Sequence, residues 1–531
     1  MARSNRAWLW SIFVAVLSLV LLTALFSTGF FPVQSDETHL AWVGKQAANG
    51  LVPYGDFFSY FPPLTIYLVA DAFKLFGTSL AVLRFLTILW LSGLSIALFH
   101  LLRRPGLSPG WSAGAALLYP ALYLPYWPVP SHHWFALGFG LLALLAAVRA
   151  LERGSAALWF VAGAFAALSG LCLQTDGALC CALLFLILLQ VPDKDRRVRL
   201  GLWAAAGLAL PLVAVALIVA LQGSLDWAWY DLVVWPSRFY KRQGGFNDVD
   251  TVAFLRDMVL HRLPAGFSLK ALAPLATLLA ALALPVLALV LPAFSPAWTS
   301  GDRRLDGRWM WTLAAILLAI ALYLRGRADW THLICYLPFL LFALVHGIDW
   351  TEERWRPRVL KGWIAVGLVL SASQWPSVLL QHPPCFSNVA NIDADFRAHG
   401  SPSLLSLFPE AIQERLPILY LPDGSGLLFH WEPVPPPLDW LMLPSSGVDA
   451  PWEYETWARF ADSHQVPFII VREPFVKGFL TEPSPIADLL KNEYRPERQT
   501  PWGTIFVRTK PGPKSAAVTP EKEPLPKGGS P

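Results

Sequence analysis

The chain has 531 residues, of which 55% are hydrophobic and only 15% are charged, and 25 of its residues are tryptophan. Soluble domains carry roughly 25% charged residues, so this composition argues against a soluble protein and indicates a membrane protein. The net charge of +4 comes from short basic clusters between apolar runs, which favours a topological explanation over nucleic-acid binding. The five cysteines show no spacing of a zinc site or a disulfide framework.

The apolar runs predict a polytopic helical body. A spanning helix needs about 20 apolar residues, because its backbone polar groups must be satisfied internally. The first run, Trp8 to Phe30, is longer than a signal-peptide core and predicts an uncleaved span. We expect about eleven spans in all, at 8–30, 79–101, 111–127, 134–150, 156–173, 178–191, 200–221, 271–293, 309–324, 333–348 and 361–380.

The charge distribution predicts the orientation. With the amino terminus in the cytoplasm, every loop assigned to the inside is basic, as at Arg103–Arg104 and Lys194–Arg199. The loops assigned to the outside are acidic, aromatic or mixed, which agrees with the positive-inside rule. An odd number of spans places the carboxyl-terminal part outside. The sequence therefore predicts a multi-pass protein of the plasma (inner) membrane with an extracytoplasmic carboxyl-terminal domain.

The carboxyl-terminal part has a different pattern. Strand-like runs at Pro417–Leu421 and Val466–Val471 alternate with helix-like stretches at Glu453–His464 and Pro485–Glu493, which predicts a small α/β domain. The last residues are rich in Pro, Lys, Gly, Ser and Glu, a composition typical of disorder. The expected organisation is a transmembrane body at 1–381 with its first outer loop at 31–78, an α/β domain at 382–510 and a disordered tail at 511–531.

Two adjacent carboxylates, Asp36 and Glu37, follow the first span. A charge at the membrane interface costs stability unless it is paired or useful, so these residues are candidates for chemistry. The structural alternative is that they end the span and begin the next helix, since acids favour the positive end of a helix. The pair alone leaves both interpretations open.

The residues that follow the acidic pair form an ordered set of motifs. A helix-like segment to Ala48 leads to a turn with Gly50, Pro53, Tyr54 and Asp56, then to Pro62-Pro63-Leu64, Phe76-Gly77-Thr78-Ser79 and Arg84. This order, from Asp36 to Arg84, resembles the first outer loop of the GT-C glycosyltransferases. The resemblance is to the branch that contains protein O-mannosyltransferases, lipid A aminoarabinose transferases and related bacterial sugar transferases.

The resemblance implies a GT-C-like membrane body with interfacial helices in the first outer loop and a sugar donor carried on a polyprenyl phosphate. It implies that Asp36 is the catalytic base, and a carboxylate suits that role because the acceptor hydroxyl must lose a proton as it attacks. Glu37 and Asp56 would orient the base or bind sugar hydroxyls, Tyr54 would contact substrate, and Arg84 would approach the phosphate.

Further polar groups are expected on the same outer side. His132 and His133 lie between the third and fourth spans, and turn residues, substrate contacts and metal ligands all remain open for them. Asp176 joins the fifth and sixth spans, as a helix cap or a substrate contact. A third group of candidate substrate-binding residues precedes the tenth span and consists of Arg327, Asp329 and His332. Arg327 could bind the carrier phosphate or form an ion pair with Asp329.

The predicted function is transfer of a hexosyl or pentosyl group, with inversion, from a polyprenyl-phosphate donor to a hydroxyl of an envelope polysaccharide, lipid or protein. The expected partners are this donor, the acceptor and membrane lipids, without nucleic acid. No cofactor or metal site is assigned, although a divalent cation is possible. The alternatives are a multi-pass transporter or lipid flippase, and a non-enzymatic scaffold whose outer domain binds envelope material.

Overall fold

A computed structural model describes most of the chain up to residue 237 and shorter pieces beyond it. The described residues are 7–27, 36–103, 108–124, 128–237, 334–339, 341–342, 358, 361–362, 364–365, 386–393, 408, 418–421, 458, 461–462, 465–471, 485–500 and 503–509. The chain divides into two compact units, of which the first comprises Met1–Thr28, Arg84–Val215 and Asn247–Ala390, and the second Gly29–Leu83, Ala216–Phe246 and Asn391–Pro531.

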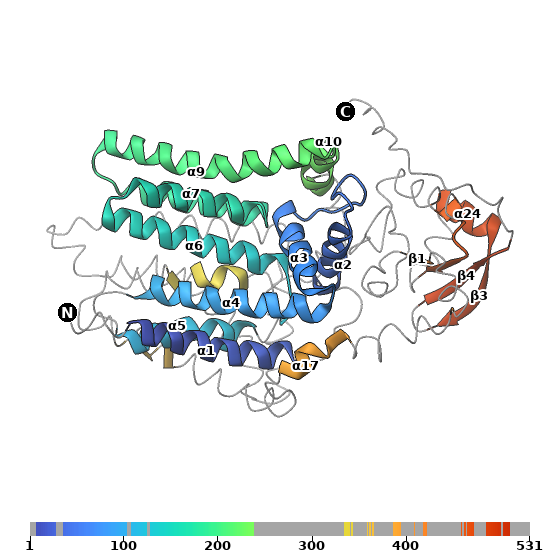
Figure 1. The fold of residues 1–531 in the computed structure, drawn as a ribbon, viewed down its shortest axis with the longest axis horizontal. Helices are drawn as coiled ribbons and strands as arrows, with labels where there is room; N and C mark the ends of the chain where they lie inside the picture. Colours follow the sequence, from blue (N-terminus) through green and yellow to red (C-terminus); the bar gives the residue numbers. More distant parts are fainter. Residues whose placement is uncertain are drawn as a thin grey trace, which may run out of the picture. The chain divides into compact units, whose positions relative to one another are not determined.

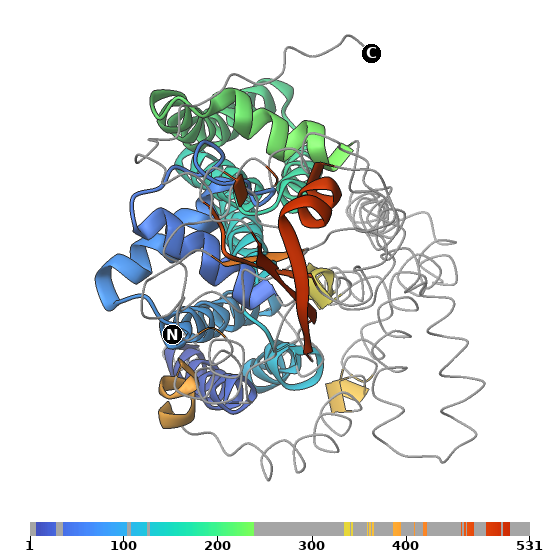
Figure 2. The same ribbon diagram turned by 90° about the vertical axis from the view of Figure 1, so that its right-hand side faces the viewer.

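The first unit is a bundle of apolar helices, which run along a common direction in Figure 1 and are seen nearly end-on in Figure 2. Its elements are α1 (Ala7–Phe26), α4 (Leu80–Leu102, whose first turn belongs to the second unit), α5 (Pro109–Leu118), the π-helical turn η1 (Tyr119–Tyr123), α6 (His132–Arg153), α7 (Ala156–Gly170), α8 (Gln174–Leu188), α9 (Lys194–Leu221, whose end from Ala216 belongs to the second unit), η8 (Ile334–Tyr336) and α17 (Phe386–Ala390). In the part of the chain that the structure describes, α1, α4, α6 and α9 are long and apolar enough to cross a membrane.

Local signals set the ends of these helices. Ser131 precedes α6, and its hydroxyl accepts the backbone N–H of His133. Gly154 ends α6 with φ of 64°, a left-handed conformation that favours glycine, and Ser155 then caps α7. Because this connection is so short, α6 and α7 run antiparallel and pack along their length. Both helices contribute a buried tryptophan to the core cluster, Trp134 from α6 and Trp159 from α7.

The first seven predicted spans correspond to α1, α4, α5, α6, α7, α8 and α9, and their ends differ by several residues. The membrane nature of the chain is therefore supported by the helices themselves. The last four predicted spans, from 271 to 380, fall mostly outside the described residues. The number of eleven spans consequently remains a prediction.

The second unit contains the first outer loop, with helices α2 (Asp36–Ala48) and α3 (Pro63–Phe76) where the sequence predicts them. Acids in its first turn favour the start of α2, and Pro63 begins α3 in the position where proline suits a helix. The two helices pack closely, with Gly44 against the side chain of Val69. A second piece of this unit begins within α9, at Ala216, and continues with α10 (Leu225–Trp229) and the π-helical turn η3 (Tyr230–Val234).

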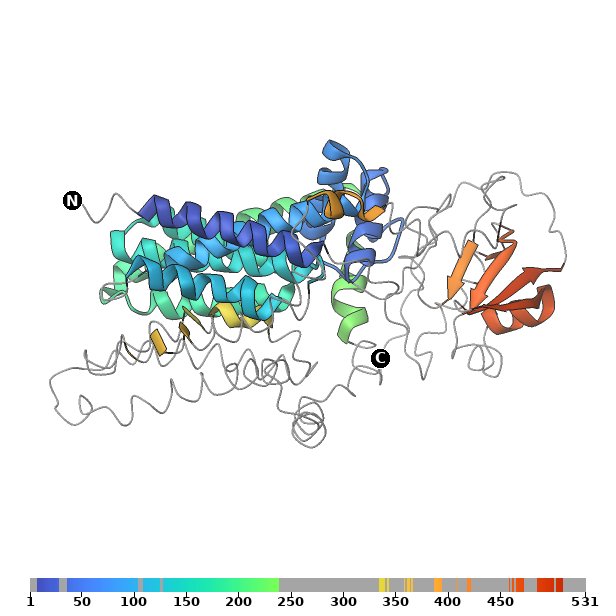
Figure 3. The ribbon, with the colours of Figure 1, turned by 90° about the horizontal axis from the view of Figure 1, so that it is seen from below.

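A four-stranded sheet with the order β1-β2-β4-β3 lies in the carboxyl-terminal part. Its strands are β1 (Ile418–Leu421), β2 (Phe468–Val471), β3 (Tyr494–Thr500) and β4 (Gly503–Arg508), and helix α24 (Pro485–Glu493) lies beside them in Figure 3. The pair β1–β2 is parallel, whereas β4 is antiparallel to both of its neighbours. The sequence did not predict β3 and β4; β3 is an exposed edge strand that contains Pro496 and lacks apolar alternation.

Candidate functional site

Hydrogen bonds between helices show which helix ends of the first unit lie together. The indole Nε1 of Trp90 in α4 donates to the carbonyl of Trp134 in α6 at 2.8 Å. The hydroxyl of Ser169, at the end of α7, donates to the carbonyl of Ala136 at 2.9 Å, and the thiol of Cys180 in α8 lies 3.8 Å from the same hydroxyl. The start of α6, the end of α7 and the start of α8 therefore share one end of the unit, at which α4 also begins.

The end of α1 lies at this same end. Arg84, in α4, is 1% exposed, and its Nη1 donates to the carbonyl of Phe26 at 2.7 Å. This bond satisfies one of the carbonyl groups that a helix leaves open at its carboxyl terminus. The guanidinium thus has a structural contact within the protein, and the phosphate contact predicted for Arg84 remains a prediction.

The opposite end of the first unit is basic. Arg103 directly follows the last turn of α4, and Arg153 occupies the last turn of α6. Arg196, near the start of α9, lies against Gly154 at the end of α6. The first unit therefore has one cationic end and, opposite to it, the end at which α1 and α7 finish and α4, α6 and α8 begin.

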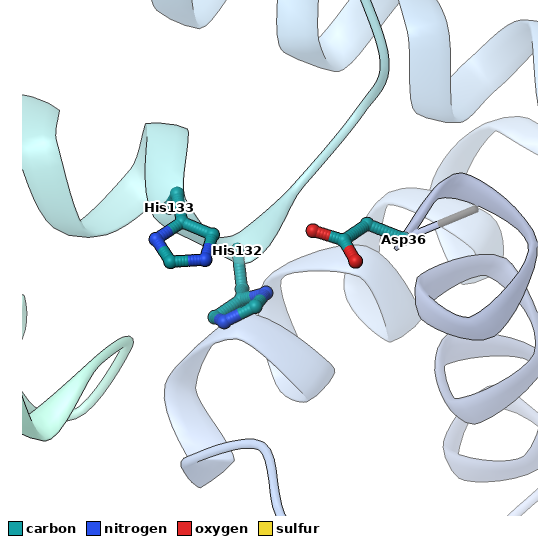
Figure 4. A group of neighbouring side chains, drawn as sticks. All are labelled: Asp36, His132 and His133. Atoms are coloured by element: carbon teal, nitrogen blue, oxygen red, sulfur yellow. The ribbon is translucent and has the colours of Figure 1, made fainter. Parts of the chain in front are cut away.

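His132 and His133 belong to this second end. The sequence placed them in a turn, but the structure places both in the first turn of α6, because Ser131 caps the helix one residue earlier. The two rings are 4.2 Å apart between centroids at 40°, and both side chains are buried. Figure 4 shows them leaving the start of α6, and it also shows the carboxylate of Asp36. Imidazole nitrogens are ligands for divalent metal ions, and a divalent cation remains a prediction.

Asp176 lies at the same end, in the first turn of α8 rather than in the loop that the sequence predicted. Its side chain is 1% exposed, and the phenol of Tyr336 donates to Oδ1 at 3.2 Å. Among the residues that the structure describes, Oδ2 has no hydrogen-bond partner. A buried carboxylate oxygen of this kind is an acceptor for a ligand hydroxyl. No local pattern singles out Tyr336, because it lies in an apolar stretch of the sequence.

Asp36 and Glu37 open α2 in the second unit, as the resemblance and the capping alternative both require. Glu37 is completely buried, whereas Asp36 is half-buried. A general base must be accessible to the acceptor hydroxyl. Of the two carboxylates, Asp36 is accessible, whereas Glu37 is enclosed and can only support its neighbour. This difference agrees with the roles predicted for them, although those roles remain predictions.

Tyr54 and Asp56 shape the turn that follows α2. Tyr54 has φ of 67°, unusual for a residue with a side chain, and its phenol donates to the carbonyl of Phe61 at 2.7 Å. Burial raises the pKa of Tyr54, and the carboxylate of Asp231 adds to the increase. The Oδ2 of Asp56 accepts the backbone N–H of Val52 at 2.7 Å. Both side chains thus hold the loop, and their substrate contacts remain predictions.

One set of candidates cannot be placed. Arg327, Asp329 and His332 lie outside the described residues, so the substrate contacts predicted for them, including that of Arg327 with the carrier phosphate, stay predictions. Conversely, the structure reveals a buried carboxylate, Asp231, that the sequence did not single out. Its acceptor contact with the backbone of Ser59 joins residues too far apart in the chain for a local motif to reveal.

A scan against protein-family models and a search of curated proteins both find no match for the chain. Solved structures do match. ArnT from Cupriavidus metallidurans bound to undecaprenyl phosphate has a TM-score of 0.53 at 14% identity, covering 94% of this chain and 97% of that chain. The apo state of the same protein gives 0.51 at 16% identity, covering 95% and 98%. This likeness concerns the fold alone: over nearly its whole length, the chain has the fold of these two ArnT structures.

Proposed function

We propose that this protein is a membrane glycosyltransferase that moves a sugar from a polyprenyl-phosphate carrier to a hydroxyl group of an envelope polysaccharide, lipid or protein. The similar ArnT structure is bound to undecaprenyl phosphate, a carrier of this class, which supports the choice of donor. The observation that carries the proposal is the separation of a basic end from an end that carries His132, His133 and Asp176.

The two ends also support the orientation. Positively charged residues favour the cytoplasmic side, so the end near Arg103, Arg153 and Arg196 would face the cytoplasm. The end with the histidine pair would then face outward. Asp36 follows α1 by a short stretch of chain, which allows it to reach this outer side. We place the protein in the plasma (inner) membrane, with its amino terminus inside and an extracytoplasmic domain at 382–510.

The proposed reaction is a single inverting displacement. The acceptor oxygen attacks the anomeric carbon of the donor sugar and passes its proton to the carboxylate of Asp36. The bond between the anomeric carbon and the phosphate oxygen breaks, and the polyprenyl phosphate leaves with the electron pair. Glu37 supports the base, and the buried acceptor oxygen of Asp176 would bind a hydroxyl of the sugar.

The main alternative, a transporter or flippase, makes a different prediction in vesicles. The purified protein would be placed in liposomes that contain the lipids of the cells that make it, and new glycosides would be measured by mass spectrometry. A transferase forms a glycoside and releases polyprenyl phosphate. A flippase instead makes lipid-linked sugars accessible to a periodate reagent outside the vesicle, without any new glycoside, and that result would contradict the proposal.

Matched variants sharpen this experiment. Asp36→Asn removes the proposed base, whereas Asp71→Asn makes the same chemical change at an exposed position of α3, where the carboxylate lies 4.0 Å from Lys74 in a surface ion pair. We expect glycoside formation to fall by a factor of about 100 or more in Asp36→Asn, as for loss of a general base. Asp71→Asn should match the wild type. Equal activity of all three proteins would contradict the assignment of Asp36.

A further inference from the structure

Asp231 is a buried carboxylate of the second unit that the proposed reaction does not use. It lies in the π-helical turn η3 and is 2% exposed. Its Oδ2 accepts the backbone N–H of Ser59, in the first outer loop, at 3.1 Å. Burial of a carboxylate costs free energy unless hydrogen bonds compensate for it, and π-helical turns are frequent at functional sites. The contact with Ser59 is therefore a feature that needs an explanation.

An aromatic contact on each side of Ser59 reinforces this bond. The ring of Trp235, directly after η3, stacks on Tyr60 with centroids 5.6 Å apart at 18°. The same indole meets the ring of Phe58 edge-on at 5.2 Å and 70°. Trp235 is 1% exposed, so these contacts are enclosed by protein. The segment after α10 thus holds the backbone of Ser59 and the side chains of both of its neighbours.

The held segment in turn packs against the first turns of α2. Tyr60 stacks on His39 at 5.7 Å and 15°, and Phe61 meets the same imidazole edge-on at 4.5 Å and 84°. Phe57 contacts Trp42 edge-on at 5.6 Å. His39 is one helical turn beyond Asp36 on the same helix. A continuous set of contacts therefore leads from Asp231, through residues 57–61, to the turn of α2 that carries Asp36.

We propose that Asp231 is a positioning residue, which fixes the Phe57–Phe61 segment against α2 and thereby fixes the orientation of Asp36. The role requires only the carboxylate oxygen that accepts the N–H of Ser59, so the side-chain amide oxygen of an asparagine can replace it. The first part of the inference concerns only the structure of the loop. The second part, the effect on Asp36, rests on the function proposed above.

Hydrogen–deuterium exchange of the full-length protein tests the first part without any assay of activity. Asp231→Leu preserves the approximate shape and removes the acceptor, so exchange within Phe57–Phe61 should become about tenfold faster, as expected for loss of one net hydrogen bond. Asp231→Asn should exchange like the wild type, as should Asp226→Ala, which changes an exposed carboxylate of α10. Unchanged exchange in Asp231→Leu would overturn the inference. Asp231→Ala is the second variant if Asp231→Leu does not fold.

The glycoside assay in liposomes tests the second part. We expect Asp231→Leu to lower kcat by a factor of about 10 or more with a smaller change in KM, and Asp231→Asn to restore most of the activity, because positioning needs the acceptor rather than the charge. An Asp231→Asn protein that exchanges like the wild type but is as inactive as Asp231→Leu would overturn the positioning role. If the exchange results hold while even the wild type forms no glycoside, the proposed function fails and the positioning of the loop stands.

Discussion

The Asp231 carboxylate has an environment that changes its proton affinity. Burial raises its pKa well above the ordinary value of 3.8, and the hydrogen bond from the Ser59 backbone offsets part of this increase. The phenol of Tyr54 interacts electrostatically with the Asp231 carboxylate, and it donates its hydrogen bond to the carbonyl of Phe61. The second unit therefore contains a buried acid, Asp231, whose ionisation opposes the folded state.

This burial predicts a pH-dependent effect of Asp231→Asn. Because the folded-state pKa of Asp231 is raised, its favourable contribution is complete below the unfolded-state pKa and is lost as the pH rises through the folded-state pKa. Asparagine has no proton to lose. We expect the melting temperature of Asp231→Asn to exceed that of the wild type by an amount that grows as the pH rises from about 4 to about 8. A difference that stays constant over this range would contradict the interpretation.

At the scale of helices, α7 and α9 approach each other through two glycines. A Cβ atom at Gly163 would collide with the carbonyl oxygen of Ala204, and one at Gly207 would collide with the carbonyl oxygen of Phe160. Small residues allow this close backbone contact between membrane helices, where apolar side chains gain little by leaving lipid. The crossing therefore depends on the absence of side chains at these two positions.

Substitution of Gly207 tests this crossing. Gly207→Ala should destabilise the protein by about 1–3 kcal/mol, because the backbones must separate to admit the methyl group. Gly93→Ala in α4 is the matched control, since no atom lies within 4 Å of a Cβ at that position. Thermal unfolding in detergent measures both. Equal melting temperatures for the two variants would show that the α7–α9 contact does not contribute to stability.

Sequence patterns predicted the elements better than their ends or their partners. The apolar runs and the acidic and proline helix starts located α1 to α9, because hydropathy and first-turn chemistry act locally. Hydropathy alone began the spans of α6 and α8 too late, beyond His132 and Asp176, since polar residues occupy the first turns of these two helices. The contacts of Asp231 with Ser59 and of Tyr336 with Asp176 join residues far apart in the chain, so no spacing rule could reveal them.

At the scale of the whole molecule, the first unit has two ends with different chemistry. The basic end agrees with the charges that the sequence placed on the cytoplasmic side, and the other end carries the histidine pair and Asp176. The fold similarity to the two ArnT structures extends over nearly the entire chain. Substrate identity is decided by pocket shape and polar contacts rather than by the fold.

The most direct test is the profile of envelope glycans and glycolipids, measured by mass spectrometry, in cells that make equal amounts of the wild type, Asp36→Asn or Asp71→Asn protein. The account predicts that one defined species loses a single sugar in Asp36→Asn cells alone, which would also identify the acceptor. A profile in which Asp36→Asn cells match the wild type, although cells without the protein lack that sugar, would contradict the role of Asp36 as the base.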